Sequence, residues 1–165
     1  MRAPICFLLL TVAMFRASAA ETTPAAAAKA LDPRVEAALK SQSVTYVDDD
    51  GDFRLIYRLG DGRTQVVWIA SATARITKLE LRDVWSLAYR GTGQPSPEMT
   101  RRLLTENARM VLGAWQVNQS ADKFLVVYLA QIPADADAAS LQEVVEAVAV
   151  SADRIEKELT GADEF

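Results

Sequence analysis

The feature that most constrains this chain is the run Phe124–Leu129, six apolar residues in a row with the sequence FLVVYL. Successive side chains of a strand point to opposite faces of its sheet, so a strand that is apolar at every position is typically buried on both sides. We therefore predict a strand here, and we expect something to cover each of its two faces.

A strand with one buried face is predicted before it, from Phe53 to Leu59. Its apolar side chains recur with the period of two that a half-buried strand requires, at Phe53, Leu55, Tyr57 and Leu59. The turn Gly60–Gly62 then leads into another strand, from Gln65 to Ala70.

Three further strands complete the expected sheet. Val44–Val47 precedes the turn Asp48–Gly51, and Lys78–Tyr89 is apolar in one parity except at Asp83, where we expect a bend. A second hairpin joins the segment at Trp115 and Val117, across Ser120–Asp122, to a strand from Phe124 to Ile132.

Three helices are predicted from their caps. Asp32-Pro33 begins a short first helix, and Ser96-Pro97 begins a second that we expect to end near Leu112. A last helix begins near Asp137 or Ser140 and ends near Gly161.

The order of these elements is helix, four strands, helix, two strands, helix, which predicts the α+β class with an antiparallel sheet of about six strands. The βαβ rhythm and the Gly-rich loop of Rossmann and P-loop proteins are absent from the sequence. A chain of 165 residues has room for one such core. We assign residues 32–161 to this domain and 162–165 to a tail.

The N-terminal segment has the pattern of a secretory signal. Arg2 is followed by the apolar run Ile5–Phe15 and by small residues at the expected cleavage region, Ala17, Ala19 and Ala20. We predict a signal peptide over 1–20 and an Ala-rich linker over 21–31, although Ala also favours a helical extension there. The apolar run is too short for a permanent membrane span, so the mature protein is expected in the periplasm or outside the cell.

Composition excludes many kinds of chemistry. The chain has no histidine, and its one cysteine, Cys6, lies in the predicted signal. A mature protein of this kind lacks a His base, a Cys nucleophile, thiolate–zinc sites and disulfides. A net charge of −4 argues against nucleic acid as the main partner. We expect no cofactor, no metal and no enzymatic activity.

Two groups of acidic residues are candidate sites. The run Asp48–Asp52 is rich in carboxylates, but alignment on Gly51 puts Tyr46 and Tyr57 at the first and last positions of a calcium loop, so a solvated turn is favoured. Asp153 and Glu156, with Glu143 and Glu146 upstream, suggest an acid/base pair. Their helical spacing favours a solvated polar face.

Arginines and aromatic residues suggest binding surfaces. Arg54 and Arg58 point the same way from one strand and would form an anion site with Arg82 or Arg90, although they also serve to keep a sheet face soluble.

Trp68, Trp85 and Trp115 favour core or interface packing over a ligand-stacking platform. Asn107 is unfavourable inside a helix, so we expect it to bond a backbone group of the sheet.

From about Leu31 to Leu159 the chain resembles the YbjN family. The resemblance rests on the order of elements and on short motifs: Val84-Trp85-Ser86, Leu103-Leu104 followed by Asn107, Gly113-Ala114-Trp115, and Ala152-Asp153 with Glu156 and Leu159. It implies the fold of type III secretion chaperones and a role in regulating sensory transduction. The related chaperones dimerise and hold extended segments of a client. Most such proteins are cytoplasmic, and the predicted signal departs from that pattern.

We therefore expect an exported, non-enzymatic domain that binds another polypeptide or forms a homodimer. The alternative is a small-ligand-binding protein of the cell envelope, with a pocket between sheet and helices. Trp85, Tyr89, Trp115 and Asn107 are the candidate interface or pocket residues.

Overall fold

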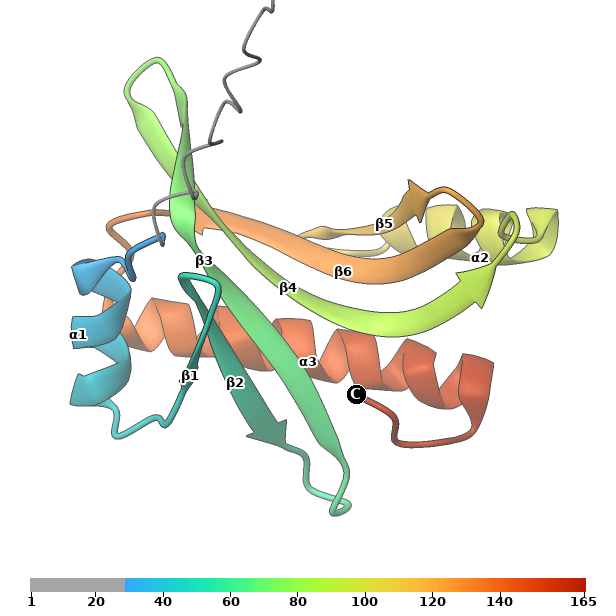
Figure 1. Cartoon of the computed structure of the whole chain (residues 1–165), viewed down its shortest axis with the longest axis horizontal. Helices are drawn as coiled ribbons and strands as arrows, with labels where there is room; N and C mark the ends of the chain where they lie inside the picture. The colour runs from blue at the N-terminus through green and yellow to red at the C-terminus, as the bar shows by residue number, and fades with distance from the viewer. Residues whose placement is uncertain (1–28) are drawn as a thin grey trace, which may run out of the picture.

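The computed structural model describes residues 29–165 and has the predicted α+β fold (Figure 1). Its elements follow one another in the predicted order: α1 (Pro33–Ser41), β1 (Val47–Asp49), β2 (Asp52–Arg58), β3 (Thr64–Ile76), β4 (Leu79–Thr92), α2 (Pro97–Asn107), β5 (Ala114–Ser120), β6 (Lys123–Pro133) and α3 (Ala138–Thr160). The predicted signal peptide and most of the predicted linker lie outside the described residues. No helix within 29–165 is long and apolar enough to cross a membrane.

The six strands form one antiparallel sheet in the order β1-β2-β3-β4-β6-β5. The returning hairpin places β6 beside β4, so the apolar run that begins at Phe124 lies inside the sheet and β5 forms its edge. The long helix α3 crosses one face of the sheet (Figure 1).

The helix caps agree with the sequence prediction except at the end of α2. Asp32, Ser96 and Asp137 each accept a hydrogen bond from a backbone N–H of the following turn. The predicted end of α2 at Leu112 is wrong, because the helix stops at Asn107. The Asn107 side chain bonds the main chain of β5, and the residues after it form a loop in which Val111 is exposed.

The core lies between α3 and the sheet face beneath it. One row of paired residues crosses four strands here, at Phe53, Ile69, Val84 and Ala130, and all four are fully buried. The apolar stripe of α3 covers this face, at Leu141, Val145, Val148, Ala152 and Ile155. We call this side of the sheet the inner face.

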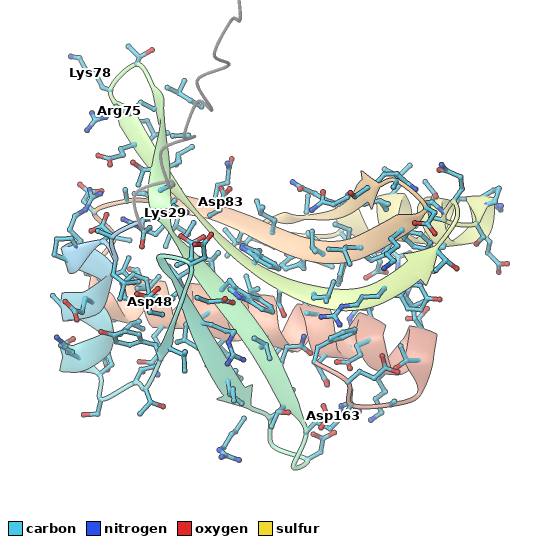
Figure 2. The ribbon with its side chains drawn as sticks, viewed as in Figure 1. Lys29, Asp48, Arg75, Lys78, Asp83 and Asp163 are labelled. Carbon is cyan, nitrogen blue, oxygen red and sulfur yellow. The ribbon has the colours of Figure 1, made fainter. Side chains whose placement is uncertain are left out.

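Strands β3 and β4 pair along only part of their length. Pairing runs from Val67 with Ser86 to Ile76 with Leu79, and the far part projects from the body as a two-stranded arm (Figure 1). Arg75 and Lys78 lie on this arm and Asp83 near its base (Figure 2). The two strands diverge at the other end, and the main-chain oxygen of Phe165 there accepts a hydrogen bond from the Val66 N–H at 2.8 Å.

Residues 162–165, expected to form a tail, are therefore held against the domain. The backbone N–H groups of Glu164 and Phe165 both donate to the Glu156 carboxylate, and Asp163 accepts from the Thr64 N–H. Asp163 accordingly lies near the connection between β2 and β3 (Figure 2).

Candidate functional site

The face of the sheet opposite α3 carries no helix in the described part of the chain. α3 packs on β3, β4 and β6, α1 packs on α3, and α2 is tied to α3 by ion pairs such as Glu106 with Arg154 at 2.5 Å. We call the other side of the sheet the open face. Register and burial place on it Arg54, Ile56 and Arg58 of β2, Val66, Trp68 and Ala70 of β3, Asp83, Trp85, Leu87 and Arg90 of β4, Leu125, Val127, Leu129 and Gln131 of β6, and Ala114, Gln116 and Asn118 of β5.

A stacked tryptophan pair lies at the centre of the open face. Trp68 and Trp85 are cross-strand partners whose ring centroids are 4.3 Å apart with planes inclined by only 6°. The Trp68 indole N–H donates to Asp49 of β1 at 2.8 Å, which fixes the orientation of the ring. On either side the same row continues to Arg54 and Leu129.

A second apolar row lies beside the first. Ile56 pairs with Val66, and Leu87 pairs with Val127. Ile56 is 61% exposed, and Val47, which pairs with Arg54 at the edge of the same face, is 54% exposed. Leu87 and Val127 are buried, so the exposed part of this row lies on β1 and β2. Together the two rows form an apolar band that crosses the strands.

β4 carries apolar side chains on both of its faces. Val84 and Ala88 lie on the inner face together with the buried polar residues Arg82 and Ser86, whereas Trp85 and Leu87 lie on the open face. The expected bend near Asp83 corresponds to a register shift in the facing part of β3, after Ile69.

Two shallow hollows mark the ends of the band. One of about 100 Å³ lies beside β1, lined by Thr45, Tyr46, Val47, Arg54 and Ile56. The other, of about 320 Å³, lies beside β5 and is lined by Gly113, Ala114, Gln116, Leu129 and Gln131. The open face is therefore hollowed at both ends of the band.

Arg82 does not join the predicted anion site. It is 1% exposed on the inner face, where its guanidinium bonds the Asp32 carboxylate at 2.6 Å and the carbonyls of Ala70 and Ser71. Those carbonyls lie within the register shift of β3, so Arg82 satisfies groups that the ladder leaves open. Hydrogen bonds from Arg34 and then Arg82 hold the pKa of Asp32 well below its usual range.

The other candidate aromatic residues do not line one pocket with Trp85. Trp115 is buried on the inner face against Tyr128, with ring centroids 5.0 Å apart, and Tyr89 lies against Phe124 at 5.8 Å. Trp85 belongs to the open face. The three residues therefore belong to different environments.

The expectation for Asn107 is confirmed. Its side-chain oxygen accepts from the Trp115 N–H at 2.7 Å, and its amide donates to the Trp115 carbonyl at 3.2 Å. Asn107 thus occupies the outer edge of β5 as a neighbouring strand would, and its role is structural.

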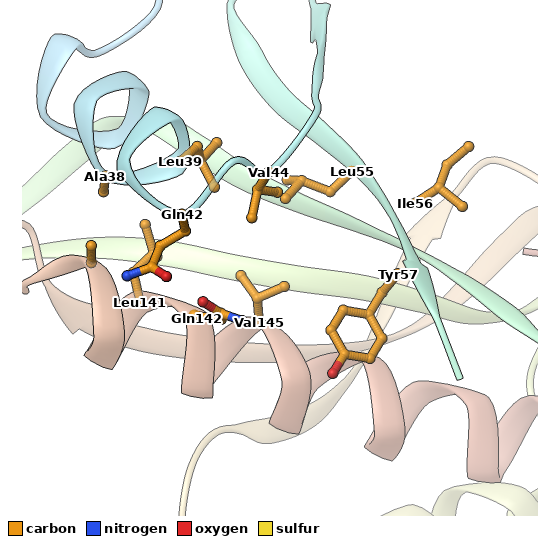
Figure 3. A pocket seen from close by; sticks show the side chains of 11 residues that line it. Ala38, Leu39, Gln42, Val44, Leu55, Ile56, Tyr57, Leu141, Gln142 and Val145 are labelled. Carbon is orange, nitrogen blue, oxygen red and sulfur yellow. The ribbon is translucent and has the colours of Figure 1, made fainter. Parts of the chain in front are cut away.

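A small apolar cavity lies between α1, β2 and α3 (Figure 3). Its volume is about 70 Å³, and its walls include Leu39, Leu55, Leu141 and Val145. Pockets for small organic ligands commonly measure about 300–1,000 Å³. This cavity has room for one apolar side chain, and it contains none of the candidate aromatic residues.

The acidic turn acts within the protein's own structure. Asp48 accepts from the Gly51 N–H, Asp49 from Trp68, and Asp52 from Lys29 and the Ser71 N–H. These bonds agree with a turn between two strands.

The acids of α3 differ from the sequence prediction in one respect. Glu156, expected on a solvated face, is fully buried, and burial raises the pKa of its carboxyl group. Carboxylate oxygens of Asp153, Glu156 and Asp163 lie close together, but the Arg63 guanidinium stands among them, 2.5 Å from Asp153 and 3.7 Å from Glu156. Arg63 supplies the positive charge that a metal ion would bring.

Comparison of the chain with known protein families gives no match, and comparison with curated proteins gives none either. The resemblance to the YbjN family stays a prediction that rests on the order of elements and the short motifs.

Proposed function

We propose that this protein is an exported, non-enzymatic binding domain whose open face binds another polypeptide. The observation that carries the proposal is the apolar band around the stacked pair Trp68 and Trp85, which no helix covers within residues 29–165. On the open side of the strand from Phe124, Val127 is already buried, whereas Leu125 and Leu129 stay half-buried. A partner would cover the parts of the band that remain exposed.

The composition of the band suits a protein interface. Large apolar patches on soluble proteins mark interaction sites, and Trp is enriched among the residues that contribute most to binding. Complete burial of an Ile side chain is worth about 1.5–3 kcal/mol, so contact with the 61% exposed Ile56 alone would contribute about 1–2 kcal/mol.

The shape of the band favours a macromolecule over a small ligand. The row from Arg54 through Trp68, Trp85 and Leu129 to Ala114 crosses five strands. At about 4.8 Å between strands it is roughly 20 Å long, a length suited to a polypeptide segment. Ligand pockets, in contrast, enclose most of the ligand surface.

The non-enzymatic and exported parts of the proposal rest on the sequence. The chain has no histidine and no cysteine beyond Cys6, which removes the commonest catalytic groups. The pattern from Arg2 to Ala20 supports export.

Site-specific photocrosslinking tests the binding surface. A photoreactive amino acid placed at Ile56 should form a defined adduct with a polypeptide in the native cells. The same group placed at Leu104, an exposed apolar residue of α2 outside the open face, is the matched control. An adduct of twice the protomer mass identifies a second copy, and any other defined mass identifies a different partner. Absence of a defined adduct at Ile56, or equal adducts at both positions, would contradict the proposal.

Cell fractionation tests the predicted export. The protein should be recovered from the envelope or the medium with an intact mass that begins at Ala20 or Glu21. An uncut cytoplasmic form would overturn the localisation and leave the binding surface to be judged by the crosslinks.

A further inference from the structure

The open face holds most of the arginines that lack an acidic partner. Within residues 29–165, seven arginines have a carboxylate oxygen within 4.0 Å: Arg34, Arg63, Arg75, Arg82, Arg102, Arg109 and Arg154. The others in this part of the chain are Arg54, Arg58, Arg90 and Arg101. Arg101 lies on α2, whereas the remaining three all lie on the open face.

These three arginines flank the apolar band. Arg54 lies in the same row as the tryptophan pair, and Arg58 follows four residues further along β2. Arg90 pairs with Leu125 on the opposite side of the divergence between β3 and β4. The band therefore has guanidinium groups on both sides, two on β2 and one on β4.

The open face also holds the carboxylates of Asp83, which accepts from Gln131, and Asp49, which accepts from Trp68, and the three arginines outnumber them. The sequence as a whole carries a net charge of −4, so the three arginines do not reflect a general excess of basic residues. A guanidinium group forms planar, two-point hydrogen bonds with a carboxylate and is a preferred residue for ion pairs at interfaces.

Resting on the proposed function, we propose that the partner is a polypeptide segment that combines acidic and apolar side chains. Its apolar side chains would lie on Trp68, Trp85 and Leu129, and its carboxylates would pair with Arg54, Arg58 and Arg90. Face-to-face contact with a second copy is disfavoured, because it would bring two sets of arginines together.

The chain's own last residues show the same chemistry beside this surface. In the sequence Asp163-Glu164-Phe165, the aromatic ring lies 5.0 Å from the Arg90 guanidinium carbon, in a cation–π contact. Asp163 lies 3.8 Å from Arg63. The aromatic ring of this segment thus contacts one of the three arginines where β3 and β4 diverge, whereas its Asp163 pairs with Arg63 outside the open face.

Selection from a random peptide library tests this partner chemistry. The library is displayed on phage with random segments of about twelve residues, which span about 40 Å when extended. It is selected against the wild-type protein and against the triple variant Arg54→Gln, Arg58→Gln, Arg90→Gln. The wild type should enrich peptides rich in Asp or Glu together with aromatic or aliphatic residues, and the triple variant should lose the acidic enrichment.

Affinity measurements then separate charge from fold. Fluorescence anisotropy of one enriched peptide should show binding that the triple variant weakens about tenfold or more, equivalent to at least about 1.4 kcal/mol. Arg101→Gln, which removes the arginine outside the open face, should leave the affinity unchanged. Circular dichroism of each variant checks that the sheet is intact.

The outcomes distinguish this inference from the proposed function. Enrichment without acidic bias, or an acidic bias that the triple variant retains, overturns the inference, and so does a library that yields no binder. If Ile56 still gives a defined crosslink in those cases, the binding surface stands without its acidic partner. Tighter binding of a single-stranded oligonucleotide, lost in the triple variant, would overturn the inference in favour of a nucleic acid.

Discussion

The buried ion pair between Asp32 and Arg82 allows a sharp test of the fold. Asp32 is shared by two arginines of different exposure: the Arg82 side chain is 1% exposed and 2.6 Å away, whereas the Arg34 side chain is 44% exposed and 2.7 Å away. The substitution Asp32→Asn keeps a good helix cap, because Asn and Asp are about equally effective there. It therefore keeps the cap bond to the Arg34 N–H but removes the charge and the acceptor that face Arg82.

The expected loss of stability follows from what remains buried. Without the carboxylate, Arg82 keeps hydrogen bonds to the carbonyls of Ala70 and Ser71 but has no counter-charge. Breaking a buried pair in this way costs about 3–5 kcal/mol. Removing only the exposed arginine, in Arg34→Gln, should cost at most about 1 kcal/mol.

Urea denaturation followed by tryptophan fluorescence measures both variants. At about 2 kcal/mol per molar urea, Asp32→Asn should lower the midpoint by roughly 2 M, and Arg34→Gln by less than about 0.5 M. The double variant Asp32→Asn, Arg82→Met removes the uncompensated charge but leaves the Ala70 and Ser71 carbonyls without a donor, so it should recover only part of the loss. Equal shifts for Asp32→Asn and Arg34→Gln would refute the reasoning.

Three further predictions concern single residues. Gly113 has φ +72°, and a Cβ there would lie 2.6 Å from a main-chain oxygen, so Gly113→Ala should lower the free energy of unfolding by about 1–3 kcal/mol. Gly60 has open space around it, so Gly60→Ala should change the free energy of unfolding little. Equal effects of the two substitutions would contradict the geometry. Asn107→Ala removes both bonds to the β5 main chain and should cost about 1–3 kcal/mol, seen as a lower melting temperature; an unchanged value would show that the edge does not need them. Burial raises the pKa of Glu156 from its ordinary value of 4.5, so the folded state binds this proton more tightly than the unfolded chain does. Wild-type stability should therefore fall as pH rises from 4.5 through the raised pKa. Glu156→Gln should remove that slope from a plot of urea midpoint against pH, and identical slopes would exclude the assignment.

The sequence predicted the helices and strands more accurately than the contacts and burial of individual side chains. Caps at Asp32 and Ser96 are local signals, in which a side chain bonds its own following turn, and both are observed. The end of α2 was misplaced because Asn107 bonds a strand that follows it in the chain, a long-range contact that helical periodicity does not contain.

The candidate surface was harder to predict than the fold. Alternation identifies two faces of a strand but does not say which one the helices cover, and in β4 the parity with Trp85 is the uncovered one. Glu156 was assigned to a solvated face on account of its charge, although its spacing of four and seven residues from the buried Ala152 and Ala149 places it on the apolar stripe of α3. There the N–H groups of residues 164 and 165 donate to its carboxylate. The positions of Arg54 and Arg58 on one face follow from period two, whereas their lack of acidic partners is visible only in three dimensions.

Two polar residues on the inner face of β4, Arg82 and Ser86, also affect which side of the strand is exposed. Sliding this strand by one residue past its neighbours would exchange its two sides, bringing Trp85 under α3 and moving Arg82 into solvent. Both sides of β4 carry apolar residues, Val84 and Ala88 on one and Trp85 and Leu87 on the other, so hydrophobicity alone separates the two alignments poorly. The salt link from Arg82 to the start of α1 exists in only one of the two alignments. A buried charge thereby selects the strand alignment that leaves the tryptophans outside.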